Sequence, residues 1–272
     1  MTKPGDTAPE VSERRRAPQA HDAFASFPER IAQLQAVLPM EERTRANLER
    51  SLTGIDAQER ERFLATHGER LQDLATFGPA KYADFTYWAH RSALVAEWLD
   101  LDRSPPLDIL DIGMGSGSFA MVVQSMGHRV TGTDVADEWY DELCRLAGVR
   151  RVVAPVERGA DYRPVEDRFD LITIMLPVFH RRRVDGRREY WAVEDWRRFL
   201  AGLQRDLLKP GGAIFILMPL DKNDEGEESY SPVLAWAEAR GATLGRTHPS
   251  QPIAHILWRP VEAETFAPDN RD

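Results

Sequence analysis

The sequence predicts an α/β fold, in which a region of helices precedes a mostly parallel sheet. After Pro105 and Pro106, short runs rich in Ile, Leu and Val alternate with amphipathic stretches. Strands that are apolar throughout need helices on both faces of the sheet. Before that point, apolar residues recur every three or four positions, as they do along one face of a helix. We therefore expect a helical region at 28–104 and the sheet domain at 105–262.

The helical region is interrupted at Pro39, at Gly54 and at the pair Gly78-Pro79, which divides it into about four predicted helices. The last of them is expected over about 84–99. We interpret this region as a cap over the substrate site rather than as an independent domain.

The sheet domain contains seven predicted strands. The first five are expected at 107–113, 128–134, 149–155, 169–176 and 212–220. Helices are expected between them at 117–126, 136–147, 192–207 and 229–239. The last two strands, 242–247 and 253–259, flank the short turn His248-Pro249-Ser250, so they must pair antiparallel. The Arg-rich segment 181–188 is expected to be a polar loop.

Composition and charge exclude several classes of protein. The 272 residues carry 35 Lys and Arg against 44 Asp and Glu, and this net charge of −9 argues against nucleic-acid binding. The lone Cys144 excludes an intramolecular disulfide and a multi-cysteine metal site. No apolar run approaches the ~18 residues of a membrane span, and the N-terminus has no signal-like apolar core. We expect a cytoplasmic protein with a disordered tail at 1–27 and a flexible tail at 263–272.

The strongest chemical signal is the glycine-rich stretch 111–117, DIGMGSG, which follows an apolar strand and leads into a helix. Glycines there allow a tight turn and let a ligand approach backbone N–H groups at the helix N-terminus. Asp134 ends the next strand, where an acid is placed to accept hydrogen bonds from two ribose hydroxyls. The pair indicates a nucleoside-bearing cofactor at the carboxyl edge of the sheet.

The residues in this turn favour one nucleoside cofactor over another. The dinucleotide fingerprint needs Gly or Ala where this chain has Ser118, and Asp111 would bring negative charge near a pyrophosphate. S-adenosylmethionine carries an ammonium and a sulfonium group and no phosphate, so it suits an acid at this place. The sequence therefore favours S-adenosylmethionine, with an NAD-dependent oxidoreductase as the alternative.

The stretch 111–117 resembles motif I of the class I S-adenosylmethionine-dependent methyltransferases. The resemblance extends over about 107–260, since Phe169-Asp170 resembles the start of the family's fourth strand and 207–212, LLKPGG, its turn into the fifth. The final antiparallel pair resembles the family's sixth and seventh strands. The resemblance implies a Rossmann-like seven-stranded sheet, mostly parallel with an antiparallel last strand, and methyl transfer from S-adenosylmethionine.

The resemblance also implies a set of cofactor-binding residues. They are Asp111, Gly113, Met114, Gly115, Gly117, Asp134, Val135, Val156 and Met175. Asp111, Gly113 and Gly115 would frame the methionine part, and Asp134 would hold the ribose. Val135 would pack on the adenine, and the backbone of Val156 would lie beside the adenine amine.

The acceptor is indicated less directly. The fourth strand ends in 175–180, MLPVFH, which lacks the Asn/Asp-Pro-Pro-aromatic motif of the amino-methylating enzymes. Leu176 and Pro177 also stand where metal-dependent O-methyltransferases would have an acid. These features favour metal-independent methyl transfer to oxygen or nitrogen of a small molecule, with no metal ligands, no nucleic-acid partner and no membrane contact. A non-catalytic S-adenosylmethionine-binding protein is a further alternative.

Two features near the acceptor are open to two interpretations each. His180 lies just beyond the fourth strand, and imidazole titrates near neutrality, so it is the candidate catalytic base. A role in packing the loop is at least as consistent with its position. Arginines at 181, 182, 183, 187 and 188 follow it, and they either recognise a carboxylate or phosphate on the acceptor or form a solvated loop.

Overall fold

The computed structural model describes residues 27–72, 78–185, 187–219, 230–248 and 251–259. The predicted C-terminal tail at 263–272 lies outside the described residues, as does the predicted N-terminal tail except for Phe27. The turn residues Pro249 and Ser250 lie outside them as well.

A seven-stranded sheet forms the centre of the molecule, with the strand order β3-β2-β1-β4-β7-β9-β8. Its strands are β1 (Asp108–Ile112), β2 (Arg129–Asp134), β3 (Arg151–Val153), β4 (Phe169–Met175), β7 (Leu208–Pro219), β8 (Thr243–His248) and β9 (Gln251–Trp258). Neighbouring strands from β3 to β7 pair parallel, whereas β9 pairs antiparallel with both β7 and β8. The predicted Rossmann-like sheet with an antiparallel last strand is confirmed.

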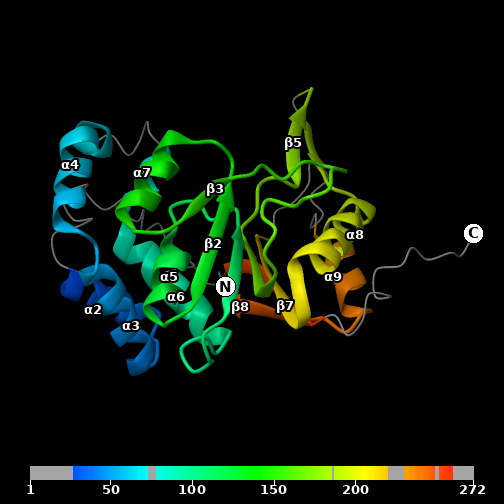
Figure 1. Ribbon diagram of the computed structural model, residues 1–272, viewed down its shortest axis with the longest axis horizontal. Coiled ribbons are helices and arrows are strands. Elements are labelled where there is room, and N and C mark those ends of the chain that lie inside the picture. Colours follow the sequence, from blue (N-terminus) through cyan, green and yellow to red (C-terminus); the bar gives the residue numbers. More distant parts are fainter. Residues whose placement is uncertain (1–26, 73–77, 186, 220–229, 249–250, 260–272) are drawn as a thin grey trace, which may run out of the picture.

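Helices cover both faces of this sheet (Figure 1). The helices before the sheet are α2 (Phe27–Val37), α3 (Glu42–Thr53), α4 (Ala57–Gln72), the 3₁₀ turn η1 (Gly78–Ala83) and α5 (Phe85–Trp98). The helices that follow in the chain, between the strands of the sheet, are α6 (Ser118–Ser125), α7 (Glu138–Leu146), α8 (Val193–Gly202), its π-helical extension η2 (Leu203–Leu207) and α9 (Ser231–Glu238).

The two faces of β7 show why the strands are apolar throughout. Ala213, Phe215 and Leu217 pack into a core with the N-terminal helices and α6. Ile214 and Ile216, which alternate with them, pack into a second core with α8 and α9. Successive side chains of a strand point to opposite faces, so a sheet covered on both sides needs apolar residues at every position.

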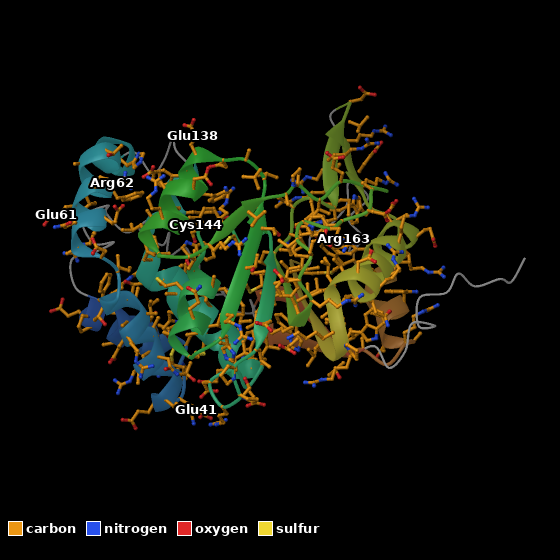
Figure 2. The ribbon with its side chains drawn as sticks, viewed as in Figure 1. Glu41, Glu61, Arg62, Glu138, Cys144 and Arg163 are labelled. Atoms are coloured by element: carbon orange, nitrogen blue, oxygen red, sulfur yellow. The ribbon has the colours of Figure 1, made fainter. Side chains whose placement is uncertain are left out.

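The N-terminal helices are part of the first core. Helices α3 and α5 pack against α6, and Leu48 and Leu52 of α3 are completely buried in the same cluster as Phe215. Helix α4 packs instead on α7, where Arg62 forms a 2.8 Å ion pair with Glu142. Figure 2 shows Arg62 on the side of α4 that faces α7. These helices therefore cover one face of the sheet in addition to reaching its carboxyl edge.

The segment predicted as a polar loop is a β-hairpin, so that prediction is wrong. Strands β5 (Arg181–Val184) and β6 (Arg187–Tyr190) pair antiparallel and form a separate two-stranded sheet, which projects at the upper right of Figure 1. Successive arginines hide any alternation of polar and apolar residues. The pair Asp185-Gly186 is nevertheless typical of a two-residue hairpin turn, and Asp185 has the positive φ of 49° that such turns use.

The residues predicted to form the turn into the fifth strand are part of that strand instead. Strand β7 begins at Leu208 rather than at 212, and its register with β4 shifts between Phe169 and Leu171. The ammonium group of Lys209 lies 2.6 Å from a carboxylate oxygen of Asp108 and 2.9 Å from one of Asp170. These contacts join the amino ends of β1, β4 and β7, opposite the edge where the glycine turn lies.

Candidate functional site

The glycine turn between β1 and α6 has the backbone conformation that its sequence predicts. Gly113, Gly115 and Gly117 have φ values of 76°, 54° and 75°, in the left-handed region where a side chain is strained. At Gly117 there is also no room, since an added Cβ would lie 2.5 Å from Cγ2 of Val149. The N–H groups of Gly113 and Met114 donate to the Thr133 carbonyl at 2.8 and 3.1 Å, which holds the turn against the end of β2.

Asp134, at the end of β2, reinforces the same turn. Its carboxylate accepts hydrogen bonds from the backbone N–H of Gly115 and from its neighbour Val135, each at 2.7 Å. Each carboxylate oxygen has a second lone pair for a further donor. The half-buried carboxylate lines a cavity, so a donor in that cavity can reach it.

Asp111 is a completely enclosed acid with one unsatisfied oxygen. Its neighbour in the sheet is Thr173, whose hydroxyl donates to Oδ1 at 2.8 Å. No described residue hydrogen-bonds to Oδ2. Burial raises the pKa of Asp111 to about 7. The hydrogen bond from Thr173 lowers this pKa, and the nearby charge of Asp134 raises it. A cationic group close to Oδ2 would favour the ionised form.

A cavity of about 340 Å³ opens at this carboxyl edge of the sheet. Seven of the nine predicted cofactor-binding residues line it, while Asp111 and Gly117 lie outside its lining. Val135, which is 47% exposed, forms part of its rim. The fold therefore brings these seven residues, from separate parts of the sequence, to one cavity.

Aromatic side chains from separate elements form the wall beside Asp134. The ring of Tyr82 lies 4.9 Å from that of Trp88 and 5.7 Å from that of Tyr140 between centroids, and all three line the cavity. Burial raises the pKa of Tyr140 well above its usual range, so its hydroxyl stays protonated. The sequence analysis did not single out Tyr82 or Tyr140, because they meet only in the folded chain.

The other end of the cavity begins where β4 ends. Leu176 has a φ of 51°, which a non-glycine residue rarely adopts, and its N–H donates to the Leu217 carbonyl at 2.7 Å. This bend directs the chain so that 177–179 line the cavity after Met175 and Leu176. Unusual backbone conformations of this kind cluster at functional sites.

His180 lies outside this lining. It is 1% exposed, its Nε2 is hydrogen-bonded to the Tyr230 hydroxyl, and its ring stacks on Tyr190 and Trp196 at 5.8 Å between centroids. Burial, with the charge of Arg181, lowers the pKa of His180 to about 4. These contacts do not fit the predicted catalytic base. They fit the packing role that the sequence left open.

The charged residues of the cavity also differ from those expected. The described part of the lining contains two charged side chains, Asp134 and Arg91 of α5. The hairpin arginines whose side chains the structure describes are not in this lining, and Arg182 forms a 2.7 Å ion pair with Glu189 of the same hairpin. The sequence offered no local signal for Arg91, because α5 mixes apolar residues with several polar ones and nothing distinguishes Arg91 among them.

Three smaller expectations concern metals, membranes and the cysteine. Among the described residues, no group of three or more His, Cys, Asp or Glu side chains is arranged to hold a metal ion. None of the described helices combines the length and apolarity needed to cross a membrane. Cys144 is buried, as predicted, with its thiol 3.3 Å from the Gly115 carbonyl behind the glycine turn.

Part of the sheet domain matches a known protein family. Residues 109–212 match a family model described as a methyltransferase domain. No curated protein matches the sequence significantly.

Several solved structures are similar in fold. One is a protein from Pyrococcus horikoshii OT3, 15% identical, with 63% of this chain and 91% of that chain covered and a TM-score of 0.46. The S-adenosylmethionine-dependent methyltransferase SibL, in its apo form, is 19% identical, with 86% and 74% covered and a TM-score of 0.44. An amino pentose methyltransferase from Micromonospora echinaspora, with S-adenosylmethionine bound, is 16% identical, with 63% and 91% covered and a TM-score of 0.42.

Proposed function

The chain carries a class I S-adenosylmethionine-dependent methyltransferase domain, and from that premise we propose that it methylates a small molecule at oxygen or nitrogen without a metal ion. Its cofactor, S-adenosylmethionine, supplies a methyl group on a sulfonium centre. The residues present fit this cofactor. Asp111 offers an unsatisfied buried oxygen for the ammonium group, and Asp134 offers a carboxylate for the ribose.

The observation that carries the proposal is the extent of the cavity beyond those residues. From Met175 it continues along 176–179 on one side and along α5 on the other, with Leu94, Val95 and Leu217 in its wall. Its volume of about 340 Å³ lies within the range typical of small-molecule sites. A mainly apolar cavity of this kind can hold the acceptor in line with the methyl group and limit its contact with water.

Metal independence is supported by the chemistry at the end of β4. The side chains of Met175, Leu176 and Pro177 contain no oxygen ligand where the chain passes the proposed transfer site. Methyl transfer from a sulfonium centre needs orientation more than Lewis-acid activation. This chain therefore contributes by binding, aligning and desolvating the reactants.

Calorimetric titration tests the cofactor half of the proposal. S-adenosylmethionine and its product S-adenosylhomocysteine should bind, and NAD should not. The variant Asp134→Ala should lose most of that affinity, since it removes both the ribose acceptor and the support for Gly115. Asp161→Ala, at an exposed acid outside the cavity lining, is the matched control and should bind normally. Binding of NAD alone would overturn the proposal.

Methyl transfer to a panel of acceptors tests the other half. The panel contains small phenols, amines and hydroxy acids, and uses S-adenosylmethionine labelled in its methyl group, with and without a chelator. We expect transfer to at least one small acceptor, with equal rates in both conditions. Cofactor binding without transfer to any member, or transfer that the chelator abolishes, would contradict the proposed reaction.

A further inference from the structure

Three aromatic rings from separate elements lie one against the next beside the cavity. The ring of Phe215 in β7 lies 6.0 Å from that of His255 in β9 between centroids, with 34° between the planes. The His255 ring lies 6.3 Å from that of Trp98 in α5, with 25° between the planes. Phe215 is buried, His255 is half-buried and Trp98 is 45% exposed. These residues therefore form an aromatic column that runs from the core to the surface.

Gly245 of β8 leaves room for the middle ring of the aromatic column. It pairs with His255 in the sheet, and a Cβ added to Gly245 would lie 2.3 Å from Cε1 of the imidazole. The ring therefore lies over the backbone of β8, where a side chain would otherwise stand. Burial lowers the pKa of His255, so its ring is predominantly neutral at pH 7. The column is thus a stack of uncharged aromatic rings.

Trp98 is the member of the aromatic column that lines the cavity, while Phe215 and His255 are not in the lining. The strand order places β9, beside Trp98, four strand spacings from β2. At about 4.8 Å per spacing this is a distance of about 19 Å. Asp134, the proposed ribose ligand, ends β2. Trp98 therefore lies at the end of the cavity that is left for the acceptor.

The cavity gathers apolar side chains that the fold leaves exposed. Among the described residues, five large apolar side chains are exposed, and three of them, Trp98, Val135 and Val178, line the cavity. Exposed apolar side chains that occur together mark a binding site. Val95, one helical turn before Trp98, is only 5% exposed, so α5 could bury a side chain here. The exposed indole of Trp98 is thus available to a ligand.

We propose that the acceptor carries an aromatic ring and that this ring stacks on Trp98, as the next member of the aromatic column. Aromatic rings prefer offset-stacked or edge-to-face contacts with centroids about 4.5–7 Å apart, and the contacts within the column have this spacing. A saturated ring of the same size fills the same space without that contact. The proposal rests on the proposed function, because it narrows the small molecule to an aromatic alcohol or an aromatic amine.

A pair of uncharged probes with one carbon skeleton tests the proposal. The probes are 2-naphthol and its saturated counterpart, decahydro-2-naphthol. The protein is first loaded with S-adenosylhomocysteine and then titrated calorimetrically with each probe. Trp98→Leu keeps an apolar side chain and removes the ring, whereas Trp98→Phe keeps a ring. Val153→Ala, at an exposed apolar residue of β3 outside the cavity lining, is the control.

The readout is the ratio of the affinities for the two probes, because a general loss of apolar area affects both. An aromatic pair contributes a factor of about two to ten in affinity. We expect the ratio of 2-naphthol to saturated probe to fall by this factor in Trp98→Leu and to stay unchanged in Trp98→Phe and Val153→Ala. Affinity for S-adenosylhomocysteine and thermal unfolding confirm that each variant is folded.

Three results would overturn the proposal. They are an unchanged ratio in Trp98→Leu, an equal fall in Trp98→Phe or Val153→Ala, and no binding of 2-naphthol to the loaded, unaltered protein. Absence of S-adenosylhomocysteine binding in the unaltered protein would instead contradict the proposed function.

Discussion

Asp111 is the residue whose environment departs furthest from that of an ordinary surface acid. Its carboxyl group is completely buried beside Thr173, and desolvation raises its pKa to about 7. In the folded protein it therefore keeps its proton between pH 4 and 7, where the unfolded chain has already released it. Stability falls as pH rises through that window, because the unfolded chain there binds one proton fewer than the folded protein.

Cofactor binding should show the opposite dependence on pH. An ammonium group near Oδ2 needs the ionised carboxylate, so binding below pH 7 must first displace a proton from Asp111. We expect affinity for S-adenosylhomocysteine to fall about tenfold per unit of pH below 7, with release of one proton. Asp111→Asn keeps an acceptor for Thr173 and cannot titrate, so its weaker affinity should be nearly independent of pH between 5.5 and 7.

Titration calorimetry in two buffers of different ionisation enthalpy measures both the affinity and the number of protons released. Asp108→Asn serves as the control, because Asp108 lies at the opposite edge of the sheet, where hydrogen bonds from Arg129 and then Lys209 lower its pKa to about 2. That variant should keep the pH dependence of the unaltered protein. The same slope in Asp111→Asn would show that another group supplies it.

Helix α5 contributes more to the candidate site than any other element outside the sheet. It begins after Asp84, whose side chain accepts a hydrogen bond from the Tyr87 N–H at 3.0 Å and pairs with Arg30 of α2 at 3.3 Å. A cap of this kind satisfies one of the free N–H groups at the helix start. Asp84 therefore determines where the face carrying Trp88 and Arg91 begins.

Removing this cap should lower the stability of the protein before it affects catalysis. Asp84→Ala leaves the Tyr87 N–H without its acceptor and should lower the free energy of unfolding by about 1 kcal/mol. Asp84→Asn keeps a capping oxygen and loses only the ion pair, so its loss should be smaller. Urea denaturation of both variants measures the difference. Equal losses would assign the effect to the Arg30 contact.

Elements with a local pattern were predicted well from the sequence. Strands β1, β4 and β7 are rich in Ile, Leu and other apolar residues, and the glycine turn needs positive φ angles at Gly113, Gly115 and Gly117. The β5–β6 hairpin was missed because its arginines show no period of two. Its stability comes from cross-strand pairing and from the aromatic cluster around His180.

The residues of the candidate site likewise differ in whether a local sequence pattern marks them. The candidate residues of the glycine turn could be named from the sequence because the motif is one continuous stretch, 111–117. Tyr82, Arg91 and Tyr140 come from segments that meet only in the fold, and no spacing in the sequence reveals that meeting. His180 was assigned from its place after β4, but the direction of a side chain past a strand end depends on packing.

At the scale of the whole molecule, the sheet is shared by two hydrophobic cores. One contains α3, α5 and α6, and the other contains α8 and α9. Alternate residues of the same strands lie in each core. If the strands unfold, the apolar residues of both cores therefore become exposed. Because α3 and α5 pack on α6 within the first core, we expect the N-terminal helices and the sheet to unfold together rather than as a separate cap.

Leu48→Ala tests that expectation, since Leu48 of α3 is fully buried and the substitution should cost about 2–5 kcal/mol. If the molecule unfolds as one unit, hydrogen exchange should show the same loss of protection in α3 and in α8, across the sheet. Val37→Ala, at a residue of α2 that is 73% exposed, is the control and should change stability by less than about 0.5 kcal/mol. Loss of protection confined to α2, α3 and α5, with α8 unchanged, would show instead that these helices open as an independent lid over the cavity.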